Sequence, residues 1–127
     1  MNLLGRIMFA VPNAVVFICD FNNRRPSPEW DGPEQVVAAG SVEAIQISVV
    51  HGQVGLADIR VGWGEPSAGL TAAYEGGLDL EFGQLMVTDV NDENALVIGV
   101  EPGRRTVRVF IDSAPWPSTI EILIDQP

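Results

Sequence analysis

Carboxylates dominate the side chains of this sequence that could do chemistry. There are 17 aspartates and glutamates against seven arginines, with no lysine, one histidine and one cysteine. The stretch from Glu75 to Glu101 holds seven of the acids and no base. Because carboxylates without nearby counter-charges attract basic groups, we expect this stretch to bind a basic protein partner. The residues expected to make that contact are Asp79, Glu81, Asp89, Asp92 and Glu93.

Two other interpretations of these acids compete with partner binding. One is a solvated face whose charge only keeps the protein soluble. The other is a calcium loop, because residues 89–94 place oxygen-bearing side chains at the first, third and fifth positions of such a loop. Its sixth position, Asn94, is not the required glycine, and its twelfth, Val100, is not the bidentate glutamate. We therefore predict no metal site and no cofactor, and keep a calcium- or carbohydrate-binding module as the alternative function.

The spacing of the remaining polar residues does not mark a catalytic centre. His51 stands beside Gly52 between two predicted strands, so we expect an exposed turn residue rather than a general base. Cys19 lies in an apolar run, where a buried thiol is unreactive. No motif singles out a pair of acids for glycosidase-type catalysis. The sequence therefore predicts a protein that is not an enzyme.

Length and composition favour one globular domain over residues 1–127. Hydrophobic residues make up 46% of the chain, and the net charge is −10 with a pI near 4.2. So negative a chain is not expected to bind nucleic acid, which requires a basic surface. The single cysteine excludes a disulfide framework within the chain, and no apolar run reaches the roughly 18 residues of a membrane helix. Without a cleavage site after residues 1–19, we expect a cytoplasmic protein that does not contact membranes.

Short alternations of apolar and polar residues indicate β-strands. In residues 54–63, Ile59 and Val61 fall on one face and Asp58 and Arg60 on the other. Turn residues separate such segments throughout the chain, so we expect an all-β antiparallel sandwich of about eight to ten strands, with a barrel as the alternative. The predicted strands cover residues 6–11, 14–21, 43–50, 54–63, 70–74, 78–82, 85–90, 95–100, 105–111 and 119–124.

One short helix is expected near residues 34–39. Pro33 and Glu34 suit the first turn of a helix, and Gly40 suits its end. A long loop rich in proline precedes it over residues 22–33. Open edges of the sheets would allow a homodimer.

The order of these elements resembles a known family. A strand that ends in Asp20 precedes the short helix, an acidic strand over residues 78–82 ends at Gly83, and the turn Pro102-Gly103 opens the hairpin before an isoleucine-rich last strand. This order resembles the competence protein J family, small acidic bacterial β-sandwich proteins that inhibit a DNA-entry nuclease. The chain lacks the aromatic ending expected of that family. The resemblance implies an inhibitor or immunity-like protein that occludes a basic nuclease or toxin.

Overall fold

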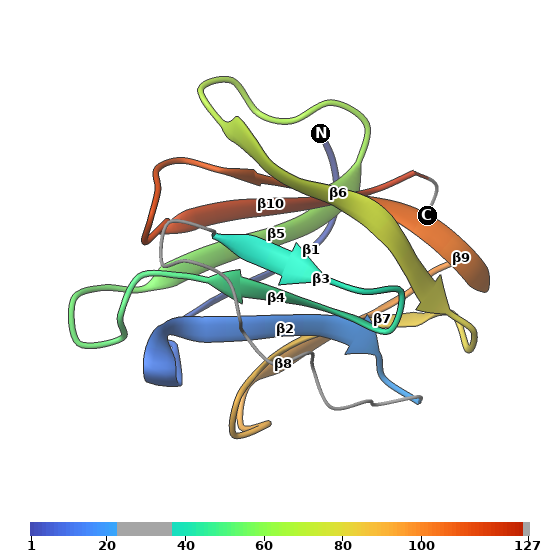
Figure 1. Cartoon of the computed structure of the whole chain (residues 1–127), viewed down its shortest axis with the longest axis horizontal. Coiled ribbons are helices and arrows are strands. Elements are labelled where there is room, and N and C mark those ends of the chain that lie inside the picture. Colours follow the sequence, from blue (N-terminus) through green and yellow to red (C-terminus); the bar gives the residue numbers. More distant parts are fainter. Residues whose placement is uncertain (23–36, 126–127) are drawn as a thin grey trace.

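Two five-stranded sheets, formed by the alternating segments, face each other in the computed structural model, which describes residues 1–22 and 37–125 (Figure 1). The first sheet has the strand order β1-β5-β10-β9-β6 and the second β3-β4-β2-β7-β8. The first contains β1 (Asn2–Phe9), β5 (Ala57–Trp63), β6 (Thr71–Leu80), β9 (Gly103–Ile111) and β10 (Thr119–Ile124). The second contains β2 (Val15–Asp20), β3 (Ala38–Gly40), β4 (Ala44–Ser48), β7 (Gln84–Asp89) and β8 (Ala95–Gly99), and a 3₁₀ turn, Pro12–Ala14, leads into β2.

Neighbouring strands in both sheets pair antiparallel, with one exception. Strands β5 and β10 run parallel, with Ile59 opposite Ile120. At the sheet edges, β1 contacts β8 and β6 contacts β3, so the two sheets meet along both sides of the sandwich. The predicted all-β sandwich is confirmed, and its antiparallel character holds for all pairs in the described chain except this one.

The helix predicted near residues 34–39 is wrong where the structure can be compared with it. Ala38, Ala39 and Gly40 form strand β3, which pairs antiparallel with β4. Residues 34–36 and most of the predicted loop, from residue 23 on, lie outside the described residues. Pairing with the edge of β4 gives these small residues a ladder of backbone hydrogen bonds, which outweighs the helical preference of the two alanines.

The strands predicted separately at residues 70–74 and 78–82 are joined in one continuous strand, β6, which covers residues 71–80 and leaves residues 81 and 82 in the turn that follows. Gly76 and Gly77 lie inside it, opposite Val107 and Thr106 of β9. A Cβ atom at Gly76 would come within 2.6 Å of the Tyr74 hydroxyl. The glycine therefore makes room for a ring on the same face of the strand instead of ending the strand.

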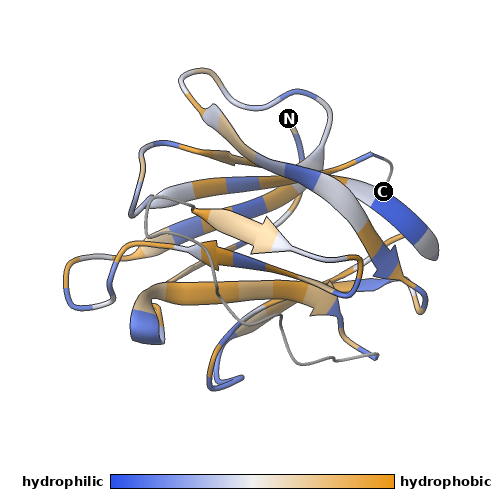
Figure 2. Ribbon diagram, viewed as in Figure 1, coloured by the Kyte–Doolittle hydropathy of each residue, from blue (hydrophilic) through white to orange (hydrophobic). Residues whose placement is uncertain are grey.

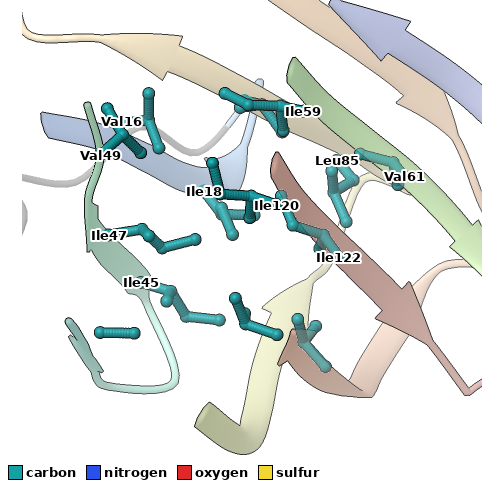
Figure 3. Close-up of a cluster of buried hydrophobic side chains, with 14 of the residues drawn as sticks. Val16, Ile18, Ile45, Ile47, Val49, Ile59, Val61, Leu85, Ile120 and Ile122 are labelled. Atoms are coloured by element: carbon teal, nitrogen blue, oxygen red, sulfur yellow. The ribbon is translucent and has the colours of Figure 1, made fainter. Parts of the chain in front are cut away.

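The core lies between the sheets and is built almost entirely from aliphatic side chains. Figure 2 shows the apolar colouring along β2, which has neighbours on both sides, β4 and β7. Each fully buried aliphatic side chain contributes about 1.5–3 kcal/mol relative to exposure, so the sandwich is a rigid support for the turns at its two ends. Core residues drawn from both sheets in Figure 3 include Val16, Ile18, Ile45, Ile47, Val49, Ile59, Val61, Leu85, Ile120 and Ile122.

Candidate interaction surfaces

The structure divides the five acids predicted to bind a partner between the two ends of the sandwich. Asp79 and Glu81 lie where β6 gives way to β7, and Asp92 and Glu93 lie in the turn after β7. The six residues of β7 at about 3.3 Å each place these two groups about 20 Å apart. Figure 1 shows the two turns well apart, with the turn after β6 at the right and the turn between β7 and β8 at the bottom. The acidic stretch therefore forms two separate clusters.

We call the first cluster, with its neighbouring turns, the Phe82 end. It comprises residues 41–43, 79–83 and 100–104, which backbone hydrogen bonds hold together. The Asp79 N–H donates to the Val42 carbonyl over 2.7 Å, and the Val100 N–H donates to the Gly83 carbonyl over 2.8 Å. Three turns from different parts of the chain thus form one continuous surface.

Asp79 makes a two-point ion pair with Arg104. The guanidinium donates from Nε to Oδ1 over 2.6 Å and from Nη2 to Oδ2 over 3.0 Å. These hydrogen bonds hold the pKa of Asp79 below its ordinary value and raise the pKa of Arg104. The pair borders a hollow of about 410 Å³ that Glu81, Pro102 and Gly103 also line. Since its charge is matched by Arg104, Asp79 adds little net charge to this end.

The unneutralised charge of the Phe82 end comes from glutamates. Glu43, Glu81 and Glu101 are exposed, and none of them forms an ion pair with another residue in the described part of the chain. Arg105 is close by, but its Nε donates to the backbone carbonyl of Glu101 over 2.9 Å. Glu43 and Glu101 were not among the predicted contact residues, because only the fold brings them next to Glu81.

Phe82 sits in the tight turn between β6 and β7, and its side chain is 54% exposed. The buried carboxylate of Asp20, at the end of β2, accepts a hydrogen bond from the Phe82 N–H over 2.8 Å. The other oxygen of Asp20 accepts from the Asn22 N–H over 2.9 Å. One buried carboxylate therefore fixes the turn that carries an exposed aromatic ring. Neither role was predicted from the sequence, although the alternation of residues 78–82 ends at this ring.

At the other end, Asp89 shapes the turn between β7 and β8. It is 1% exposed, and its oxygens accept hydrogen bonds from the N–H groups of residues 91, 93 and 94 and from the Asn94 amide. Asp92 and Glu93 are exposed in this turn. Oxygens that already receive four N–H donors do not form a calcium site, so the asparagines and aspartates here are explained by the turn itself.

Two buried acids, Asp58 and Glu121, lie on the outer face of the first sheet. The Asp58 carboxylate accepts hydrogen bonds from Nε and Nη2 of Arg6 over 2.7 and 2.9 Å. It also accepts one from Nη2 of Arg60 over 2.8 Å. Glu121 is fully buried, and it accepts from Arg60 and from the backbone and hydroxyl of Ser67. Four charged residues outside the acidic stretch, Arg6, Asp58, Arg60 and Glu121, are therefore joined in one network of ion pairs. Arginine suits this role because its planar fork donates to two carboxylates at once.

The remaining candidate residues, which are His51, Cys19 and two tryptophans, do not gather into one site. The ring of His51, which is exposed, packs against Trp116 with centroids 5.0 Å apart. Cys19 is buried with Ala44 and Met86. Trp63, at the end of β5, and Trp116, before β10, are separated by the length of a parallel strand pair, so they do not form one sugar-binding platform.

Neither a group of metal ligands nor a membrane-spanning helix is present in the described residues. Within residues 1–22 and 37–125, no three His, Cys, Asp or Glu side chains are grouped as a metal ion requires. In the same residues, no helix combines the length and the apolar character needed to cross a membrane.

Comparison with known proteins relates the chain to one solved structure. No family model and no curated protein sequence matches the chain. The crystal structure of ComJ from Bacillus subtilis, an inhibitor of the DNA degrading activity of NucA, matches with a TM-score of 0.72, over 99% of this chain and 98% of that chain. The chain has the ComJ fold. The two sequences are 10% identical, so the resemblance to the competence protein J family is confirmed in the path of the chain.

Proposed function

We propose that this protein is a non-enzymatic, immunity-like inhibitor of a basic nuclease or toxin. The observation that carries the proposal is the ComJ fold over nearly the whole of both chains, since ComJ is an inhibitor of a DNA-degrading enzyme. The net charge of −10 supports it, because an enzyme that cleaves nucleic acid binds its substrate with a basic groove. The single cysteine fits action in the cytoplasm.

Occlusion of the partner's groove is the mechanism that these features support. Exposed carboxylates take the places of phosphates and pair with the arginines and lysines that would hold them. Glu81, with Glu43 and Glu101, at one end of the sandwich and Glu93 at the other are exposed carboxylates suited to this pairing, and Asp92 lies beside Glu93 in the same turn. Asp79, paired with Arg104, and Asp89, buried in its turn, support the shape of the two ends.

A DNA-degradation assay tests this proposal. The substrates are labelled DNA fragments, and the enzymes are NucA from Bacillus subtilis and the nucleases of the protein's own host. We expect the protein to stop degradation by at least one of them at low salt. If it slows none of them, the proposed function is wrong.

Charge reversal at each end identifies the end that contacts the enzyme. Glu81→Lys changes the Phe82 end, and Asp92→Lys with Glu93→Lys changes the other. Glu65→Lys, in an exposed loop outside both ends, is the matched control. Reversal of an interfacial charge should weaken inhibition by about tenfold or more, while the control changes it much less. Equal effects from all three variants would contradict a defined acidic contact.

A further inference from the structure

Phe82 is the most exposed of the five phenylalanines, and the buried carboxylate of Asp20 holds its backbone in place. Its exposed fraction is 54%, against 38% for Phe21, the next most exposed. Burying an aromatic ring in the core stabilises a fold considerably, and a ring exposed to water does not contribute this stabilisation. Large exposed rings with a polar rim are typical of the centre of a protein interface.

The backbone around Phe82 is fixed before any partner binds. Its N–H is bound to Asp20, which is 1% exposed, and the next residue, Gly83, has a φ of 68°. The Gly83 N–H donates to the Leu80 carbonyl over 2.9 Å, and its carbonyl accepts from Val100 over 2.8 Å. A turn held on both sides loses little conformational freedom on binding, so the affinity from the ring is not offset by ordering of the chain.

The surroundings of the ring are acidic and bordered by one hollow. Glu81 directly precedes Phe82, and with Pro102 and the Asp79–Arg104 pair it lines the space of about 410 Å³. A partner that covers this end must therefore offer cations next to a surface that accepts a flat ring. Charge complementarity selects a basic groove as the occupant rather than a second copy of this acidic chain.

A carboxylate followed by an aromatic ring presents the same two chemical features as a nucleotide. Enzymes that bind single-stranded nucleic acid hold the phosphate with arginine or lysine and stack the base on an aromatic ring or a guanidinium. We propose that Glu81 and Phe82 imitate one nucleotide in the groove of the inhibited nuclease. The ring stacks where a base would stack, and the carboxylate pairs with the cation that would bind the phosphate. This inference rests on the proposed function.

Three substitutions at Phe82 test the stacking, with inhibition of DNA degradation as the readout. Phe82→Ala should raise the concentration for half-maximal inhibition by about fivefold to a hundredfold. Phe82→Leu, which is apolar but has no ring, should lose nearly as much, and Phe82→Tyr should inhibit as the parent chain does. The matched control is Leu56→Ala, because Leu56 is 53% exposed at the opposite end of the sandwich. It should leave inhibition unchanged.

A competition arm tests the site on the enzyme. A non-cleavable single-stranded oligonucleotide should raise the concentration of parent chain needed for half-maximal capture of the nuclease. Urea unfolding midpoints check that the Phe82 variants fold as the parent does, which their exposed position predicts.

The outcomes distinguish failure of the nucleotide imitation from failure of the proposed inhibitory function. If the parent chain inhibits no nuclease, the proposed function fails first. If the parent inhibits and Phe82→Ala inhibits equally, the nucleotide imitation is wrong and the function stands. If Phe82→Leu inhibits like the parent, or the oligonucleotide does not compete, the ring makes only an apolar contact outside the groove, which also overturns the inference.

Discussion

Two buried carboxylates, Asp20 and Asp89, organise the turns at opposite ends of β7. Both are 1% exposed, and the partners that the structure gives them are N–H groups of nearby turns. A carboxylate that accepts several such bonds satisfies backbone N–H groups that a tight turn would otherwise leave unpaired. Part of the acidity of the chain is therefore structural, and only the exposed carboxylates are available to a partner.

Asp58 gives a pH-dependent test of the arginine network on the first sheet. The hydrogen bond from Arg6 lowers its pKa most, burial opposes this, and Arg60 lowers it further. Because the pKa is lower in the folded state, the stabilisation is complete at neutral pH and is lost as the pH falls below about 4. We expect Asp58→Asn to reduce the free energy of unfolding at pH 7 by about 1–3 kcal/mol.

Urea unfolding at pH 7, 5 and 3 measures this effect. The difference between the parent and Asp58→Asn should be similar at pH 7 and 5 and should shrink towards pH 3. Glu65→Gln, an exposed acid in a loop, is the control and should show no such trend. A difference that stays constant down to pH 3 would show that the ion pairs with Arg6 and Arg60 do not stabilise the fold.

At the scale of elements, turns with special backbone geometry fix where β6 ends and β7 begins. Gly83 has a φ of 68°, and an added Cβ would lie 2.6 Å from the Val100 carbonyl oxygen. Gly83→Ala should therefore destabilise the fold by about 1–3 kcal/mol, through the strained φ and the clash with backbone. Gly99→Ala, in β8, is the matched control because nothing lies within 4 Å of its added Cβ. Equal unfolding midpoints for both variants would contradict a special role for Gly83.

The strands were predictable because one face of each is buried. The alternation around Ile59 and Val61 gave β5 correctly, since a period of two places every second side chain in the core. Strand β3 was missed because Ala38, Ala39 and Gly40 have no alternation and owe their extended form to pairing with β4. Such pairing joins distant segments, and a local pattern does not record it.

The candidate site was predictable in composition but not in arrangement. The sequence pointed to Glu81 and Glu93 as one acidic stretch, yet the predicted strand at residues 85–90 already separates them along its length. Glu43 and Glu101 join Glu81 only through hydrogen bonds between turns. Phe82 looked like a strand residue, and its exposure follows from the turn that Asp20 holds.

At the scale of the whole molecule, a rigid sandwich carries exposed carboxylates at both ends. Seven bases do not balance 17 acids, so the field around the protein is negative beyond any single contact. Such a field accelerates encounter with a basic partner, while short-range contacts determine how long the complex lasts. Acids far from the contact should therefore affect the association rate constant, and the Phe82 ring should affect the dissociation rate constant.

Association kinetics with the inhibited nuclease test this division. Raising the salt from about 0.05 to 0.5 M should slow association strongly, because the Debye length falls from more than 10 Å to a few ångströms. Glu65→Gln with Glu75→Gln, both exposed and outside the Phe82 end, should slow association at low salt and leave dissociation unchanged. Phe82→Ala should speed dissociation at every salt concentration and leave association nearly unchanged. An association rate that does not respond to salt would mean that the negative field of this protein plays no part in finding its partner.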